Sequence, residues 1–191
     1  MSFYLNSMAF WIGTIVALFL IWGIASYNLL VRKRNRVESG WSEIDVELKR
    51  RHDLVPNLVA AVQGYMQHER EVLEQVAQTR AQAIAAGNSV VARSEAETRF
   101  GVAISQLFAA SEQYPQLRAA ENLTLLQEQL ASTENRIAYA RQFYNDSVME
   151  YNTALASFPR NLISHVLGFS AAILFSATEA DRTVSAARVN G

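Results

Sequence analysis

The sequence predicts an all-α protein in which a single N-terminal transmembrane helix is followed by an elongated antiparallel four-helix bundle. No charged residue precedes Arg32, and residues 8–25 are almost wholly apolar. Beyond this stretch, apolar residues recur at seven-residue intervals, as they do in packed helices. The chain has only 3 prolines and 8 glycines among 191 residues, and no stretch alternates like a half-buried strand. This composition favours helices over a sheet.

The bulk composition excludes several kinds of function. A chain of 191 residues, 50% of them hydrophobic, suffices for one modest domain and an anchor. The formal net charge of -1 gives no general attraction to nucleic acid, so we expect no nucleic-acid partner. The absence of cysteine excludes disulfides and thiolate metal sites, but it does not fix the compartment.

Residues 1–31 are predicted to form a transmembrane anchor with a short extracytoplasmic N-terminus. A helix over residues 8–25 is about 27 Å long, which spans a hydrocarbon core with modest tilt. Trp11 lies near one end, and Trp22 and Tyr27 lie toward the other, as suits the two membrane interfaces. A cleaved signal peptide is the alternative, but it requires basic residues before the apolar run, and here they follow it.

The basic residues after the anchor predict the orientation. The positive-inside rule holds this cluster, and with it the C-terminal domain, in the cytoplasm. Contact between the cluster and anionic lipid head groups is an expected by-product of this topology. The positive-inside cluster consists of Arg32, Lys33, Arg34 and Arg36.

Residues 32–160 are predicted to form the cytoplasmic bundle, and the first bundle helix covers residues 37–65. Two adjacent rows of a seven-residue repeat form its seam: Trp41, Leu48, Val55 and Val62, and Val37, Ile44, Arg51, Leu58 and Tyr65. Pro56 lies inside this pattern and lacks a hydrogen-bond donor. We expect either a kink or a helix that restarts with Asp53 as its cap and Pro56 in its first turn.

Turn signals separate the middle helices. Gly64 is the expected end or a second break, and a second helix is predicted over residues 67–86. Gly87 suits a left-handed stop, and Ser89 suits the cap of a third helix over residues 90–112. Tyr114 precedes a proline and therefore avoids the helical region, so we expect the fourth helix to open at Pro115.

The fourth helix has the strongest pattern in the chain. It is predicted to run for some forty residues, roughly 60 Å, until Pro159 ends it. Such a repeat favours packing at small crossing angles, as in a bundle or coiled coil. The two rows are Leu123, Leu130, Ile137, Tyr144, Tyr151 and Phe158, and Leu126, Thr133, Ala140, Ser147 and Ala154.

Residues 161–191 are predicted to form an apolar strap and a flexible C-terminal tail. Residues 161–175 are strongly apolar but too few for a second span. One interpretation is a strap packed along the bundle, and the other is a segment at the membrane surface. Residues 178–191 are small and polar and are predicted to form the tail.

The sequence contains no motif that indicates a catalytic or metal site. A di-iron bundle needs Glu-x-x-His spacing, which none of His52, His68 and His165 has. His68 and Glu69 begin like a zinc-protease signature, but Val72 takes the place of its second histidine. The chain also has no glycine-rich phosphate loop and no Gly-x-Ser-x-Gly elbow. We therefore expect no enzymatic activity, no metal and no cofactor.

Polar residues in or near the helix seams form the candidate site. A buried charge must be paired, because a lone one costs several kcal/mol. One interpretation is a network between helices that fixes their register, for example Arg51 with Glu134. The other is a polar patch that docks a partner. The candidate residues are Asp45, Arg50, Arg51, Asp53, Asn57, Glu134, Asn135 and Arg141.

The order and spacing of many short pieces of the chain resemble the LemA family. The resemblance covers about residues 27–160. Gly40 stands where relatives usually carry alanine, and the segment after Leu167 departs from the more polar end expected of the family. The matching pieces include Tyr27-Asn28-Leu29-Leu30-Val31, Trp41-Ser42-Glu43-Ile44-Asp45-Val46, Leu48-Lys49-Arg50-Arg51-His52-Asp53-Leu54-Val55-Pro56-Asn57, Tyr114-Pro115, Thr133-Glu134-Asn135, Tyr144-Asn145, Tyr151-Asn152 and Phe158-Pro159.

The resemblance implies a single-pass protein of the bacterial inner membrane, with its N-terminus outside and a cytoplasmic antiparallel bundle of four helices. It brings no catalytic residues. Some relatives are associated with magnetosome-membrane formation, and some are encoded beside membrane metalloproteases. We therefore predict a non-catalytic, membrane-anchored helical scaffold that self-associates or docks other membrane proteins. The alternative is an adaptor or regulator of a membrane-bound protease. The expected partners are the lipid bilayer, further copies of the chain and other membrane proteins, a metalloprotease among them.

Overall fold

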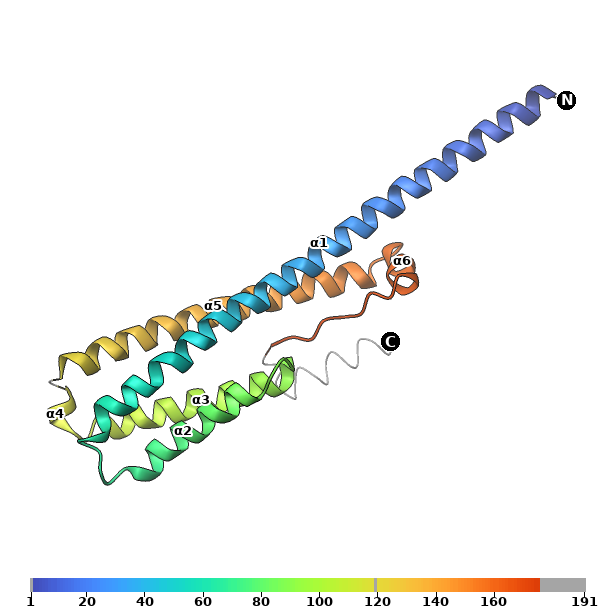
Figure 1. Ribbon diagram of the computed structural model, residues 1–191. Helices are drawn as coiled ribbons and strands as arrows, with labels where there is room; N and C mark the ends of the chain where they lie inside the picture. Colours follow the sequence, from blue (N-terminus) through green and yellow to red (C-terminus); the bar gives the residue numbers. More distant parts are fainter. Residues whose placement is uncertain (1, 119, 176–191) are drawn as a thin grey trace. The chain divides into compact units, whose positions relative to one another are not determined.

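The computed structural model describes residues 2–118 and 120–175 (Figure 1). Within these ranges every regular element is a helix, which confirms the predicted all-α class with its long N-terminal apolar helix. The helices are α1 (Ser2–Gln63), α2 (Arg70–Ala85), α3 (Val90–Ser111), α4 (Pro115–Arg118), α5 (Glu121–Ala156) and α6 (Arg160–Val166).

The chain divides into two compact units. The first consists of Met1–Ser39 and Asp146–Ala172, and the second of Gly40–Asn145 and Ile173–Gly191. Helices α1 and α5 each continue from one unit into the other, so each unit contains part of both.

The first unit contains the apolar part of α1. Among the described residues, α1 is the one helix long and apolar enough to cross a membrane, and its large apolar side chains between residues 10 and 24 are mostly exposed. Burial begins at Ser26 and Leu30. Exposed apolar surface around a helix of this length is what a bilayer covers, so the chain is a membrane protein.

The C-terminal part of the first unit folds back from the end of α5. The Ser164 hydroxyl, in α6, donates a hydrogen bond to the Leu155 carbonyl oxygen at 3.2 Å. Further along the chain, the side-chain amide of Asn152 makes two hydrogen bonds with the backbone of Ala172. It accepts from the Ala172 N–H at 2.9 Å and donates to the Ala172 carbonyl oxygen at 2.9 Å. The segment that follows α6 is therefore fixed to α5.

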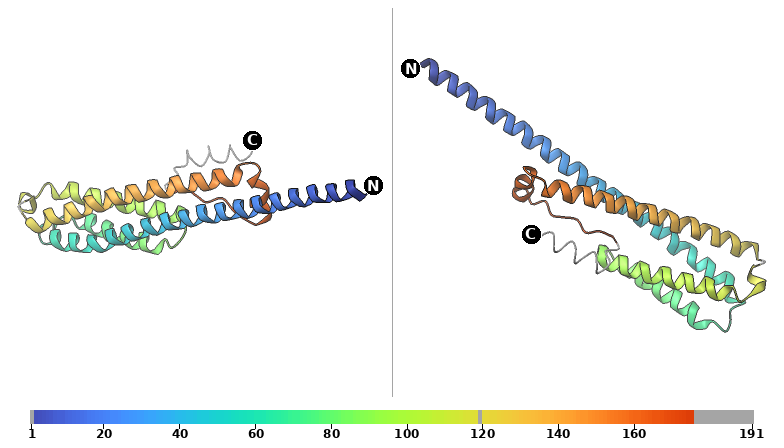
Figure 2. Two further views of the ribbon diagram at one scale, coloured as in Figure 1. Left: turned by 90° about the horizontal axis from the view of Figure 1, so that it is seen from above. Right: turned by 180° about the vertical axis from the view of Figure 1, so that it is seen from behind.

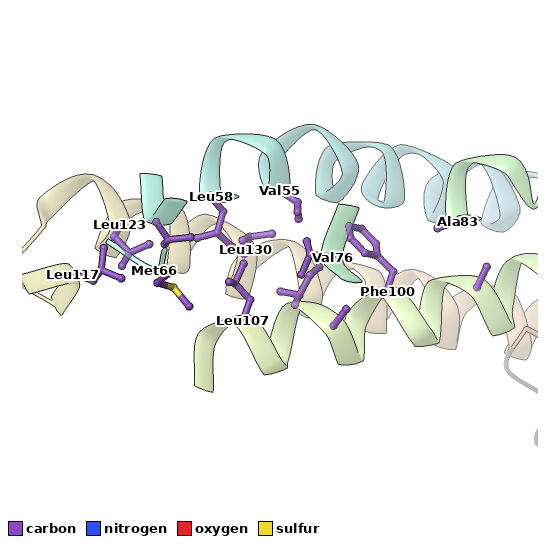
Figure 3. Packing of buried hydrophobic residues seen from close by; sticks show 14 residues of the cluster. Val55, Leu58, Met66, Val76, Ala83, Phe100, Leu107, Leu117, Leu123 and Leu130 are labelled. Carbon is purple, nitrogen blue, oxygen red and sulfur yellow. The ribbon is translucent and has the colours of Figure 1, made fainter. Parts of the chain in front are cut away.

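The second unit is built around a hydrophobic core to which α1, α2, α3 and α5 all contribute (Figure 3). The parts of these helices in this unit run side by side in both views of Figure 2. The buried cluster comprises Val55, Leu58, Val62, Met66, Val76, Ala83, Ala96, Phe100, Ala103, Ile104, Leu107, Leu117, Leu123 and Leu130.

Most side chains of the seven-residue rows are buried, and the rows fail where a helix ends. Leu48 and Ile137 are buried at their expected positions. Tyr65 is exposed because α1 ends at Gln63, and Phe158 is 81% exposed because α5 ends at Ala156. Past the end of a helix the seven-residue spacing no longer keeps a side chain on the same face.

The turns between the middle helices form as predicted. Gly87 has a φ of 64°, the left-handed conformation that favours glycine. The Ser89 side chain caps α3 by accepting a hydrogen bond from the Ala92 N–H at 3.4 Å. The single fourth helix is wrong, however, because a short α4 precedes α5. Leu117 turns into the core there, and a turn from the Ala120 N–H to the Leu117 carbonyl oxygen, at 3.1 Å, separates the two helices.

Helix α1 continues through Pro56, so the predicted restart with Asp53 as cap is wrong. A proline at this position removes the donor that the His52 carbonyl oxygen, four residues earlier, would otherwise receive. Arg80 of α2 supplies a replacement, since its Nε donates to the His52 carbonyl oxygen at 2.8 Å. The tertiary contact therefore satisfies the acceptor that the proline leaves open.

In the second unit, the end of the described chain packs against α5. The Tyr144 hydroxyl donates to the Ile173 carbonyl oxygen at 2.8 Å. Asn145 accepts from the Phe175 N–H at 2.9 Å and donates to the Phe175 carbonyl oxygen at 3.2 Å, and the Phe175 side chain is buried. These contacts favour the strap interpretation for residues 173–175. The tail predicted over residues 178–191 lies outside the described residues.

Candidate functional site

Arg51 joins three helices of the second unit. It is buried on α1, and its Nη1 donates to Glu134 Oε1 of α5 at 2.8 Å. Its Nη2 donates to the Glu97 carboxylate of α3, and also to the Glu97 carbonyl oxygen at 3.2 Å. The guanidinium carbon lies 5.3 Å from the centre of the Phe100 ring. Both terminal nitrogens of Arg51 are thus engaged inside the protein, as a buried charge requires.

Glu97 is the buried acceptor in this network. Oε1 of Glu97 lies 3.0 Å from Nε2 of His52, although the two atoms are not aligned as a hydrogen bond. Burial alone would raise the pKa of Glu97, but the adjacent His52 imidazole and the positive charge of Arg51 outweigh it, so the pKa is lowered. The carboxyl group is therefore held in its charged form.

A second ion pair joins α1 to α3. Arg93 binds the carboxylate of Asp45 through Nη2. The Arg93 guanidinium carbon lies 5.7 Å from the centre of the Trp41 ring. The Arg93 side chain is largely buried, whereas half of the Asp45 side chain remains exposed. The geometry is that of a partly exposed pair that helps to orient α3 on α1.

Arg141 lies over the ring of Phe175, the buried residue at the end of the strap. Its guanidinium carbon is 4.8 Å from the centre of the Phe175 ring, within the range of a cation–π interaction. Burial, followed by repulsion from Arg51, lowers the pKa of Arg141, while Glu134 and Glu97 act in the opposite direction. Arg141 also lines a groove of about 850 Å³ between α3 and α5, together with Arg51, Glu97 and Glu134.

The predicted site residues separate into a group that contacts neighbouring helices and a group for which none of the contacts above applies. Arg51, Glu134, Asp45 and Arg141 take part in the contacts described above, and the Arg51–Glu134 pair given as an example is present. The structure places the other four predicted residues on the exposed surface. These are Arg50, Asp53, Asn57 and Asn135.

The sequence interpretation missed Glu97, His52 and Arg93. Glu97 carried a readable signal, since it lies in the same helical stripe as Phe100 and Ile104. A carboxylate in an apolar stripe needs a buried partner. The involvement of His52 and Arg93 depends on how neighbouring helices pack, and spacing along one helix does not encode it.

Residues of α1 and α5 together form an exposed surface of the second unit. Val46 and Tyr139 are 65% and 73% exposed, and both border a hollow of about 540 Å³. Arg136 Nη1 lies 3.6 Å from Glu47 Oε1 at the same hollow. Arg50, Asp53 and Asn57 continue the exposed row on α1 at spacings of three and four residues, and Asn135 lies four residues before Tyr139 on α5. We call these six residues, Val46, Arg50, Asp53, Asn57, Asn135 and Tyr139, the outer face.

In the first unit, two of the predicted basic residues converge on one carboxylate. Lys33 Nζ lies 3.1 Å from Glu150 Oε2, and Arg36 Nη1 lies 3.7 Å from the same atom. Arg34 pairs with Glu38 on the same helix at 3.1 Å, and Arg32 is exposed. These pairs fix α5 beside α1, while the orientation across the membrane stays a prediction.

The described residues contain no group of three or more histidine, cysteine, aspartate or glutamate side chains arranged to hold a metal ion. In the network around Arg51, the charges are engaged with one another, although Arg51, Glu97 and Glu134 also line the groove between α3 and α5. This arrangement is suited to fixing helix register. The outer face instead presents large apolar side chains beside polar ones, as protein docking surfaces do.

Comparison with known proteins gives a consistent result. The pattern of the LemA family matches residues 40–190. The chain is 24% identical over 193 residues to Magnetosome protein MamQ 2 of Paramagnetospirillum magneticum, with 88% of this chain and 71% of that protein covered. It is 23% identical over 173 residues to Protein LemA of Metamycoplasma hominis, with 91% of this chain and 78% of that protein covered.

Proposed function

The chain belongs to the LemA family, and from this membership and the geometry of the second unit we propose a non-catalytic, membrane-anchored scaffold. Its outer face self-associates or docks other membrane proteins. The anchor is the apolar part of α1, placed in the bacterial inner membrane with the N-terminus outside. Relatives named as magnetosome proteins support a role at membranes.

One observation carries the proposal. Arg50, Asp53 and Asn57 point outward, although Arg51 and His52 between them point into the core. The internal network around Arg51 therefore accounts for the register of the helices without these three residues. Their exposed row continues to Val46, whose large apolar side chain is uncovered. With Tyr139 of α5, which borders the same hollow as Val46, the outer face has two large exposed apolar side chains beside polar ones, a combination suited to a protein-binding surface.

Docking through an exposed helical face needs no catalytic group. Side chains such as Tyr139 supply a large contact area at low cost in conformational entropy, and flanking polar residues fix the partner's orientation. Because α1 contains both the apolar segment and one half of the outer face, an uninterrupted helix connects the anchor to the binding surface. Confinement to a membrane raises the effective concentration of copies, so modest contacts suffice for assembly.

Substitutions on the outer face test the proposal in the full chain. We would purify the Val46→Ser/Tyr139→Ser variant in mild detergent and measure its mass by light scattering, together with the membrane proteins that co-purify. The matched control is Ile84→Ser, at a similarly exposed apolar side chain on α2. We expect the wild type and the control to self-associate or to retain a defined membrane protein, and the double variant to lose that species while keeping its melting temperature.

Two outcomes bear on the proposal in different ways. A strictly monomeric wild type that retains no membrane protein would overturn it, as would a double variant that behaves like the wild type. Retention of a membrane protease, with altered turnover of its substrates when the chain is deleted, would replace the scaffold with the protease adaptor.

A further inference from the structure

The C-terminal end of the first unit exposes a concentration of large apolar side chains. Leu162 and Val166 of α6 are 60% and 82% exposed, and they lie on one side of the helix because they are four residues apart. Phe158, just before α6, and Leu167, just after it, are also exposed. Four large apolar side chains within ten residues are more than scattered surface residues would explain. We call Phe158, Leu162, Val166 and Leu167 the apolar tip.

A direct contact fixes where the apolar tip lies along α1. The ring centres of Tyr27 and Phe169 are 5.9 Å apart, and Phe169 follows the end of α6 by three residues. Figure 1 shows α6 beyond the end of α5, beside the part of α1 that continues to the N-terminus. The apolar tip is therefore held near Tyr27.

Tyr27 marks the end of the part of α1 suited to the hydrocarbon core. Toward the N-terminus, Ile24 and Ile21 are exposed, as expected of side chains that face lipid. Toward the C-terminus, Ser26 and Leu30 are buried by protein, and the first charged residue is Arg32. Tyrosine at this position suits the boundary between the hydrocarbon core and the head groups.

We propose that α6 and the adjoining apolar tip insert into the interfacial layer of the phospholipid bilayer beside α1. The chain then contacts the membrane twice, through a spanning helix and through a short surface helix. Short amphipathic elements enter this layer to a depth of about 5–10 Å. The level of the apolar tip along the spanning helix coincides with the head-group region of the bilayer. Every copy of the anchored chain meets this region, so the molecule that covers the apolar tip is lipid rather than a protein.

The surrounding charges agree with this placement. Arg160 opens α6, and Lys33 lies on the neighbouring part of α1. These two basic residues border the same hollow of about 520 Å³. Arg160, which follows Phe158 of the apolar tip by two residues, is suited to contact with lipid phosphates. The interaction does not depend on the docking role of the outer face.

Single-cysteine labelling tests the insertion, since the natural sequence contains no cysteine. Leu162→Cys, Val166→Cys and Met149→Cys variants of the full chain would each carry an environment-sensitive fluorophore. Met149 is the matched control: it is an exposed apolar residue of the same unit, and it lies on α5 seven residues before the end of that helix, about 10 Å along it. The vesicles would contain phosphatidylethanolamine and phosphatidylglycerol in equal parts, with a fraction of lipid carrying a nitroxide near the head group.

We expect the nitroxide lipids to quench the labels at residues 162 and 166 several-fold more strongly than the label at residue 149, and a water-soluble quencher to show the reverse order. Equal lipid quenching at the three positions would overturn the proposal. Shielding from the water-soluble quencher without lipid quenching would also overturn it, because a protein would then cover the apolar tip.

Discussion

The Nε atom of Arg80 donates a hydrogen bond to the main-chain carbonyl oxygen of His52 at 2.8 Å, which is the oxygen that Pro56 leaves without its helical donor. The contact explains how α1 stays helical from Ser2 to Gln63 through a proline. It also ties α2 to α1 next to the buried network of Arg51. A side chain from a neighbouring helix here replaces a donor that the backbone lacks.

We expect the Arg80→Met variant to lower the free energy of unfolding by about 1–3 kcal/mol, because the His52 carbonyl oxygen would lose its partner. Methionine retains most of the apolar stem of arginine, so the change removes mainly the hydrogen bond. Urea unfolding of the full chain in mild detergent, followed by circular dichroism, measures the difference.

The Pro56→Ala background provides the control for this prediction. Alanine at position 56 restores a backbone donor to the His52 carbonyl oxygen. The Arg80→Met substitution should therefore cost less stability in Pro56→Ala than in the wild type. If the two changes are additive, the carbonyl oxygen is not the reason why Arg80 matters.

Arg51→Leu should destabilise the second unit by about 3–5 kcal/mol, because it leaves the buried Glu97 carboxylate without its cation. The Arg51→Leu/Glu97→Leu variant removes both charges and should recover much of the loss. The same unfolding measurement applies to both variants. An Arg51→Leu chain as stable as the wild type would show that the network contributes nothing to stability.

Glu97 predicts a loss of stability in acid. Its pKa is lowered in the folded state, so its contribution is fully present above the ordinary glutamate value of about 4.5 and disappears as the pH falls through the lower folded value. In Glu97→Gln, stability should therefore fall less steeply with pH below about 4.5, although the variant is less stable at neutral pH. The same exchange at the exposed Glu71 is the control and should leave the acid slope of the wild type unchanged.

Phe175→Ala should release the end of the strap. The change removes a buried ring that contacts Trp41 and Arg141, at a local cost of about 3 kcal/mol. Hydrogen exchange of the residue 175 amide, which donates to Asn145, should then become about a hundredfold faster. Ile173→Ala serves as the control, since Ile173 is exposed. If the exchange rate of this amide is unchanged in Phe175→Ala, the Phe175 ring does not hold the end of the strap in place.

Sequence periodicity predicts the fold class and much of the core, because a seven-residue repeat states directly which side chains share a face. It also predicts that Arg51 needs a buried partner. It does not predict the replacement of the donor missing at Pro56, because that depends on which residue of α2 lies opposite. The pair of hydrogen bonds between Asn145 and Phe175 is likewise unpredictable from spacing, since it joins a helix side chain to the main chain 30 residues away.

In the proposed function, the outer face binds protein partners of the membrane-anchored chain. The most direct measurement is photocrosslinking in cells, with a photoreactive amino acid at position 46 and, for comparison, at position 84, an exposed apolar position on α2. We expect discrete crosslinked species from position 46, either further copies of the chain or a defined membrane protein, and few from position 84. Equal crosslinking at both positions, or none at position 46, would contradict the proposed function.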